Sequence, residues 1–430
     1  MSKLNNEVNN YINNVCSFVK NKKVHKEIKL ELENHIQELT DDYISCGMSE
    51  EESLNKALLQ MGPADVVGID LNKVHKTNSD WMFLSITAAL ILFGLYTLSF
   101  IEKAALSNFN IAKKSAFILL ISIPIALIFM KIDFRSIKKY SKHIYAFSIV
   151  LLILTHFTSP TINGVRNYLS IGGFSFRISD IASLLLIISL AGIFDNYNWN
   201  SKKTMIKGGT LVFAPCLLFI LIPSVASLIV YLIAAFSIMF LSGFKIKYML
   251  SLLGTLIAVF LVSIFYEPYR LQRILGFLNP AGDPEGSGYI YKQISNLKNS
   301  AGIIGNRNSS ALSSLPEAHT DNVLTSIIYG FGWLIAIILC AVILVFIIRI
   351  IFIGKKTKNF YGKLLIAGMC TMLSSQFVFC ILSGLSFFPA MGFTMPFISY
   401  GGTSLLTNII AVSLINNIYK NRNVPYDLAV

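Results

Sequence analysis

The sequence carries little charge. Only 14% of its 430 residues are Asp, Glu, Lys or Arg, whereas soluble proteins average about 25%. Hydrophobic residues make up 54% of the chain, and the mean hydropathy is +0.62. This composition excludes an ordinary soluble protein. It also excludes a disordered one, which would have more charge and fewer aromatic residues. A polytopic membrane protein is the class that remains.

Cysteine is scarce, and several common motifs are absent. The six cysteines lie in the N-terminal region or in long apolar segments, at Cys16, Cys46, Cys216, Cys340, Cys370 and Cys380. Because none falls in a loop expected to face the outside, a disulfide framework is excluded. No Cys and His residues have zinc-ligand spacing, so no metal site is predicted. A phosphate-binding P-loop and a dinucleotide-binding glycine motif are also lacking.

Residues 1–79 have no long apolar run and hold about half of the acidic residues. Without an apolar core, the first residues do not form a signal peptide. Apolar residues recur at helical spacing between Val8 and Val19 and again within residues 25–43. Ser49 and Glu52 form a capping box that opens a third helix, which ends at Gly62-Pro63. The pattern predicts a bundle of three short helices over residues 1–79.

Two stretches of this region, EIKLELENHIQEL and GMSEEESLNKALLQMG, resemble the small helical prefix domain found ahead of some Firmicute membrane proteins. The resemblance implies a cytosolic interaction or regulatory module. An appendage that only increases solubility is the alternative, and the sequence does not decide between them.

From Trp81 onward the sequence consists of apolar segments and polar loops. A membrane helix needs about 20 largely apolar residues. Ten segments meet this description, some of them short: about 81–101, 115–131, 143–157, 180–194, 205–222, 224–243, 247–266, 323–353, 362–385 and 400–419. We therefore predict an all-α polytopic membrane protein with a ten-helix domain over residues 80–420 and a short tail, 421–430.

Lysine and arginine set the predicted orientation, because cytoplasmic loops are enriched in both. The basic residues gather in alternate short loops, at residues 131–142, 202–207, 245–247 and 355–363. These loops are on the same side as the N-terminal domain. We expect a cytoplasmic-membrane protein with both termini in the cytosol. The formal charge of +13 then comes mostly from lysine and arginine in cytosolic loops. No nucleic-acid partner is expected.

One outer loop, residues 267–322, is far longer than the others. Loops beyond about 15 residues are usually functional or disordered. This one has amphipathic anchors, among them Ile274 and Phe277 with Arg270 and Arg273. We expect it to lie along the membrane face.

Several motifs in and near this loop resemble the SEDS family, the FtsW, RodA and SpoVE proteins of shape, elongation, division and sporulation. The loop contains PYRLQRILGFLNP, then DPEGSGY, then LPEAHTD at residues 315–321. The last span opens with PFISYGGTSLL at residues 396–406, and NGVRNYLSIGGFSF from Asn163 is a weaker match. The likeness covers about residues 80–420.

The resemblance implies a peptidoglycan glycosyltransferase that polymerises lipid II and works with a class B penicillin-binding protein. Such a transfer needs a base that takes the proton of the acceptor hydroxyl, and a carboxylate in a low-dielectric site suits this role. Asp321 matches the family's catalytic aspartate. An Asp before a helix is otherwise an N-cap. His319 and Glu317 either assist the proton transfer or support the turn.

The pyrophosphate leaving group calls for cations. Arg166, Arg270 and Arg273 are on the predicted outer side, where guanidinium groups either bind phosphate or reach toward lipid headgroups. Tyr400 either lines the substrate cavity or belongs to an interfacial aromatic belt. Gly401 and Gly402 would allow a close backbone approach of the substrate. No cofactor is identified, and the need for a divalent cation stays open.

The chain departs from the family pattern at several positions. Pro-Asp-Leu-Gly is replaced by Pro223-Ser224-Val225-Ala226, and Gln-Pro-Ser-Glu by Arg177-Ile178-Ser179-Asp180. A lysine shortly after the latter becomes Ser183, and paired glutamates after the catalytic aspartate become Tyr329-Gly330. Two alternatives therefore remain: a flippase for lipid-linked precursors, and a catalytically weakened scaffold that recruits cell-wall enzymes.

Overall fold

The computed structural model describes residues 2–74, 79–103, 110–160, 167–171, 174–266, 268–306 and 308–422. The chain divides into two compact units between Ser79 and Asp80, and the residues from Tyr419 onward group with the first unit. Each unit is described by itself.

The first unit is a helical bundle. Its helices are α1 (Ser2–Phe18), the short 3-10 helix η1 (Lys22–Val24), α2 (His25–Ser45), α3 (Glu50–Met61) and α4 (Ala64–Val74). The predicted apolar faces form the core, where Val15, Ile28 and Leu54 are buried. Ser49 caps α3 by accepting a hydrogen bond from the Glu52 amide, as predicted. The fourth helix was not predicted. It begins directly after Pro63, because proline ends one helix yet is tolerated in the first turn of the next.

The second unit contains a helix at each of the ten predicted apolar segments. They are α5 (Trp81–Glu102), α6 (Ile111–Lys131), α8 (Ser141–Thr158), α9 (Ile178–Phe194), α10 (Lys202–Leu221), α11 (Val225–Leu241), α12 (Ile246–Tyr266), α15 (Val323–Lys356), α16 (Phe360–Gly384) and α17 (Gly402–Lys420). Within the described residues, six of these helices are long and apolar enough to cross a membrane, and α9, α11 and α12 contain shorter apolar stretches. A short helix, α7 (Phe134–Lys139), precedes α8. The all-α polytopic fold is confirmed.

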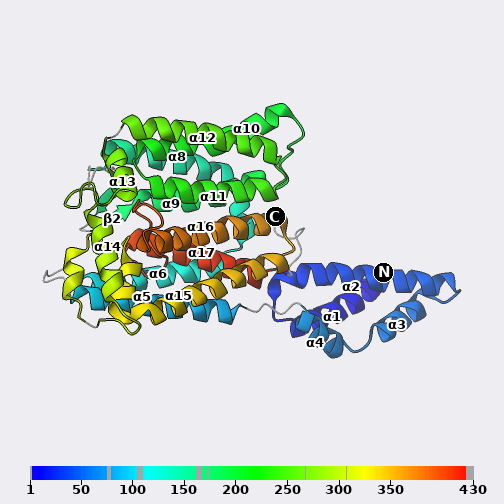
Figure 1. The fold of residues 1–430 in the computed structure, drawn as a ribbon. Helices are drawn as coiled ribbons and strands as arrows, with labels where there is room; N and C mark the ends of the chain where they lie inside the picture. Colours follow the sequence, from blue (N-terminus) through cyan, green and yellow to red (C-terminus); the bar gives the residue numbers. More distant parts are fainter. Residues whose placement is uncertain are drawn as a thin grey trace. The chain divides into compact units, whose positions relative to one another are not determined.

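The long loop between α12 and α15 is folded. It contains α13 (Pro268–Leu278), α14 (Tyr289–Ser300) and the short η2 (Ser310–Ser314). Figure 1 shows α13 and α14 at the same end of the helical bundle as strand β2. Strands β1 (Tyr168–Ile171) and β2 (Phe174–Arg177) pair antiparallel, with Tyr168 opposite Arg177. This hairpin was not predicted, although two glycines separate its strands in the sequence.

Helix α15 is broken near its start. Gly332 has φ 88° and ψ 169°, so the helix consists of two parts that meet there. At the break, the backbone of α15 hydrogen-bonds to the outer loop. The Asn306 amide donates to the Tyr329 carbonyl at 2.8 Å, and the Trp333 amide donates to the Gly302 carbonyl at 3.3 Å. The first part of α15, which follows Asp321, is therefore tied to the folded outer loop.

Candidate active site

Asp321 lies in a tight turn that joins η2 to α15. The turn begins at Glu317, which has a positive φ of 53°. The amides of Thr320 and Asn322 both donate to the Glu317 carbonyl at 3.1 Å. The Asn322 side chain donates to the Pro316 carbonyl at 2.9 Å and closes the turn from the other side. These bonds fix the backbone that carries Asp321.

The turn is also attached to the segment between α16 and α17, residues 385–401. The Tyr400 amide donates to the His319 carbonyl at 2.8 Å. The Ser399 hydroxyl donates to the Thr320 carbonyl at 2.7 Å. From α16, the Cys380 thiol lies 3.7 Å from the Asp321 carbonyl. Segments about 60 to 80 residues apart in the sequence thus hold the turn in place.

Asp321 is not the N-cap of α15. The helix starts at Val323, so the cap position belongs to Asn322. Within the described part of the chain, the Asp321 carboxylate accepts no hydrogen bond, although Arg177 and Arg273 are close enough to lower its pKa. The N-cap alternative is therefore wrong, and the carboxylate keeps its lone pairs for another partner.

Burial raises the pKa of Asp321 to about 6; Arg177 and Arg273 oppose this rise, whereas Glu317 adds to it. A carboxylate with this pKa is ionised at neutral pH and is more basic than an ordinary aspartate. The backbone of Gly392 also lies close: a Cβ built there would be 3.8 Å from Oδ2 of Asp321. The site thus combines one basic carboxylate with two guanidinium groups.

Arg177 was not predicted as a site residue. It lies where β2 meets α9, and its guanidinium donates to the Gly392 carbonyl and to the Tyr168 hydroxyl, both at 3.1 Å. Arg177 also lines a small cavity with Asp180, Ser183 and Gln376. The available signal is the departure at Arg177-Ile178-Ser179-Asp180, where a family glutamine is replaced by an arginine.

Arg273 comes from α13 in the outer loop. Its guanidinium donates to the Ala390 carbonyl at 3.0 Å. The Ala390 amide in turn donates to the Tyr291 hydroxyl of α14 at 3.2 Å. Both loop helices are therefore anchored on the segment that also carries Gly392. Of the three predicted arginines, Arg273 is the one whose side chain the structure describes, and it lies close enough to Asp321 to lower its pKa.

Three other predicted residues belong to the turn or pack on it. Burial lowers the pKa of His319, with Glu317 opposing, so the imidazole is neutral at pH 7. The rings of His319 and Tyr400 are 5.6 Å apart, and burial raises the pKa of the Tyr400 hydroxyl. The exposed Glu317 carboxylate accepts a hydrogen bond from the Thr320 hydroxyl at 2.6 Å, a contact within the turn.

The remaining predicted residues are less directly placed. Gly401 and Gly402 line a narrow gap against α5 and α6, where a Cβ on Gly402 would lie 2.8 Å from the Ile118 side chain. Arg166 is outside the described residues, and only the backbone of Arg270 is described, in α13. Among the described residues, no group of three or more His, Cys, Asp or Glu side chains could hold a metal ion.

Comparison with known proteins gives consistent matches. The model of the FtsW, RodA and SpoVE family, described as cell cycle protein, matches residues 77–424. A probable peptidoglycan glycosyltransferase FtsW of Idiomarina loihiensis is 26% identical over 80% of this chain and 88% of its own. Another, of Coxiella burnetii, is 29% identical over 70% of this chain and 85% of its own.

Two solved structures share the fold. A chain from a peptidoglycan synthase complex that coordinates polymerization and crosslinking has a TM-score of 0.70, with 22% identity over 81% of this chain and 99% of that one. The Rod shape determining protein RodA of Thermus thermophilus has a TM-score of 0.61, with 19% identity over 80% of this chain and 97% of that one. Since the family model spans most of the sequence, the chain belongs to the FtsW/RodA/SpoVE family of multi-pass membrane proteins.

Proposed function

We propose that this protein is an inverting peptidoglycan glycosyltransferase that polymerises lipid II, with Asp321 as the catalytic base. The observation that carries the proposal is the Asp321 carboxylate, whose pKa burial raises to about 6, beside Arg177 and Arg273. Relatives named as probable peptidoglycan glycosyltransferases support the reaction class.

The proposed reaction assigns a role to each of these groups. The acceptor hydroxyl oxygen attacks the anomeric carbon of the donor sugar while its proton passes to the Asp321 carboxylate. The bond from this carbon to the pyrophosphate breaks, and the pyrophosphate leaves with the electron pair. Arg177 and Arg273 stabilise the negative charge that develops there. In this proposal the neutral His319 and Tyr400 orient hydroxyl groups of the substrate, and Glu317 supports the turn.

We also propose the membrane orientation and the partner. Loops rich in lysine, such as 131–142 and 355–363, lie in the cytosol, so both termini are cytosolic and Asp321 is on the outer side of the cytoplasmic membrane. The proposed partner is a class B penicillin-binding protein. A structure of related fold from a polymerising and crosslinking complex supports this choice.

The proposal is tested by incubating the purified protein and its cognate penicillin-binding protein with lipid II and resolving the products on a gel. Wild-type protein should form polymer, and Asp321→Asn should not. Glu285→Gln, the same acid-to-amide change at an exposed outer-loop position away from the turn, is the control and should retain polymer formation. Polymer from Asp321→Asn would refute the assigned base. No polymer under any condition would favour a scaffold or a flippase.

A further inference from the structure

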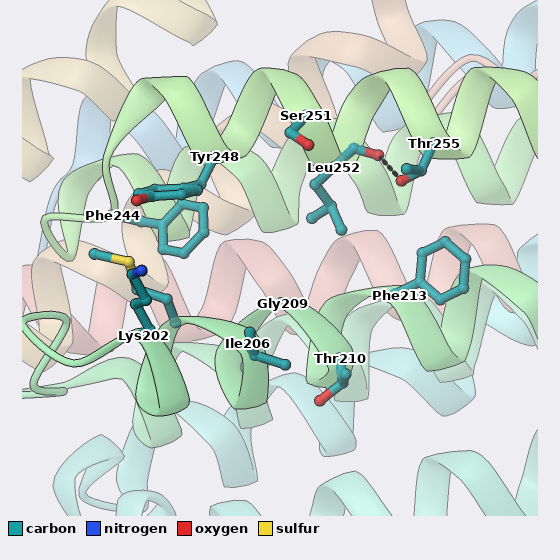
Figure 2. Close-up of a pocket in the computed structure, with 11 residues that line it drawn as sticks. Lys202, Ile206, Gly209, Thr210, Phe213, Phe244, Tyr248, Ser251, Leu252 and Thr255 are labelled. Atoms are coloured by element: carbon teal, nitrogen blue, oxygen red, sulfur yellow. Dashed lines mark hydrogen bonds between the residues drawn. The ribbon is translucent and has the colours of Figure 1, made fainter.

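A groove outside the candidate active site runs between α10 and α12. Its volume is about 510 Å³, within the range of about 300–1,000 Å³ that is usual for ligand sites. Figure 2 shows side chains of both helices around it, with Ile206 and Leu252 between the helices and Lys202 near Tyr248 and Phe244 at one end. Most of the lining is apolar.

The end marked by Lys202 is strongly basic. Lys202 and Lys203 begin α10, and Lys245 and Lys247 flank the start of α12. All four are exposed, and none of them forms an ion pair with another described residue. No Asp or Glu occurs in residues 196–210 or 242–255. Lys202 lines this end of the groove, the other three lysines are sequence neighbours of the lining residues Lys202, Phe244 and Tyr248, and neither segment contains an acid.

Aromatic packing fixes the shape of this mouth. The Trp199 indole, just before α10, donates to the Ser242 hydroxyl after α11 at 3.2 Å. Its ring packs edge-on against the Phe244 ring, with centroids 4.8 Å apart. The centroid of the Tyr197 ring lies 4.4 Å from that of Trp199. The loops that carry the two pairs of lysines are thus held together before any ligand arrives.

The interior of the groove is open. No heavy atom lies within 4 Å of a Cβ built on Gly209, which lines the groove. Among the described residues, the helices that contact α12 most are α10 and α13. In a bilayer, an apolar groove that opens toward the lipid is filled by hydrocarbon, because apolar surface favours an apolar environment.

We propose that this groove is a binding site for an anionic phospholipid, with an acyl chain between α10 and α12 and the phosphate among the four lysines. Basic pockets between membrane helices on the cytoplasmic side bind anionic lipid headgroups for the same electrostatic reason. The assignment to the cytosolic leaflet rests on the proposed orientation, whereas binding itself is independent of the glycosyltransferase activity.

The test uses the purified full-length protein, equal amounts of phosphatidylglycerol and phosphatidylethanolamine, and native mass spectrometry to count bound lipids. The wild type should retain phosphatidylglycerol preferentially. Replacing Lys202 and Lys245 by glutamine should lower this preference about fivefold for each charge removed. Glutamine at Lys355 and Lys358, in a different basic loop, should leave it unchanged.

A second pair of variants tests the groove itself. Gly209→Leu fills the interior and should reduce retention of the lipid. Gly254→Leu on α12, also with open space around its Cβ but outside the groove lining, is the matched control and should have no effect. Equal retention of both lipids by the wild type, equal behaviour of the two leucine variants, or an isoprenoid lipid in place of the phospholipid would overturn the proposal.

Discussion

At the scale of single residues, the environment of Asp321 is what makes it a candidate base. An ordinary aspartate is a weak base at neutral pH because its pKa is near 4. Burial raises the pKa of Asp321 to about 6, and two arginines keep the carboxylate from losing its charge at neutral pH. In the proposed reaction, the same guanidinium groups stabilise the charge of the leaving pyrophosphate. One small set of side chains thus serves both ends of the proposed transfer.

Arg177 offers a specific test at this scale. The family resemblance implies a lysine where this chain has Ser183, and Arg177 lines the same small cavity as Ser183. We therefore propose that Arg177 supplies the cation that the lysine would provide. Arg177→Gln should lower the polymerisation rate about 100-fold, as expected for loss of a group that stabilises transition-state charge. Adding Ser183→Lys to that variant should raise its polymerisation rate again by at least about tenfold.

The control for this exchange is Ser183→Ala, which should retain the wild-type rate. The measurement is the initial rate of lipid II polymerisation by each purified variant. An unchanged rate in Arg177→Gln, or a double variant no faster than the single one, would show that Arg177 does not act as the replacement cation.

The sequence predicted Asp321 but not its strongest electrostatic partner, for a physical reason. Asp321 stands in a long motif, LPEAHTD, that can be identified from neighbouring residues alone. The approach of Arg177 depends instead on a β-hairpin and on the carbonyl of Gly392, 215 residues away in the chain. Contacts of this kind have no local pattern, so only the folded structure brings them together.

At the scale of helices and loops, the outer loop positions the site by anchoring two elements. Arg273 of α13 and Tyr291 of α14 both bond to Ala390, which precedes Gly392. The loop backbone near Gly302 and Asn306 bonds to the break in α15. The same loop thus bonds both to the start of α15, which follows the Asp321 turn, and to the segment that carries Gly392.

The break in α15 can be tested with Gly332→Ala. A Cβ at this position would lie 2.1 Å from the Ile303 carbonyl oxygen, and its positive φ is unfavourable for alanine. The substitution should destabilise the fold by more than about 2 kcal/mol, measured as a lower thermal unfolding midpoint of the purified protein. Gly302→Ala also has a positive φ but open space around its Cβ, so it should cost only about 1 kcal/mol. Equal midpoints would contradict the tight contact.

The helices that the sequence predicted and those that it missed differ in what determines them. The apolar segments of the second unit were recognised because a window of about 20 residues carries the whole signal. Helices α13 and α14 have 11 and 12 residues, and their positions depend on bonds to Ala390. Likewise, α4 follows Pro63, where the third and last predicted helix of the bundle ends. Short elements without a long apolar run depend more on tertiary contacts.

At the scale of the whole molecule, the distribution of charge predicts which loops lie on each side of the membrane. Lysines fill alternate short loops, whereas the proposed active site uses two arginines and one acid on the other side. The first unit, residues 1–79, is expected to be cytosolic.

This orientation predicts that a thiol reagent outside the cell reaches a cysteine introduced in the outer loop but not the native Cys46. Cys46 is exposed in the first unit, and Ala281 is exposed in the outer loop. In intact protoplasts, a membrane-impermeant thiol reagent should label Ala281→Cys but leave Cys46 unlabelled. After permeabilisation, both should react. Labelling of Cys46 in intact protoplasts would place the N-terminal unit outside and reverse the proposed topology.

The most direct test of the central claim is the pH dependence of lipid II polymerisation. If Asp321 is the base, its ionised form is required, so the rate of the wild type should fall about tenfold per pH unit below about pH 6 and level off above it. Asp321→Asn should give a very low rate that lacks this acidic limb. An Asp321→Asn variant with the same acidic limb at near wild-type rate would show that another group takes the proton.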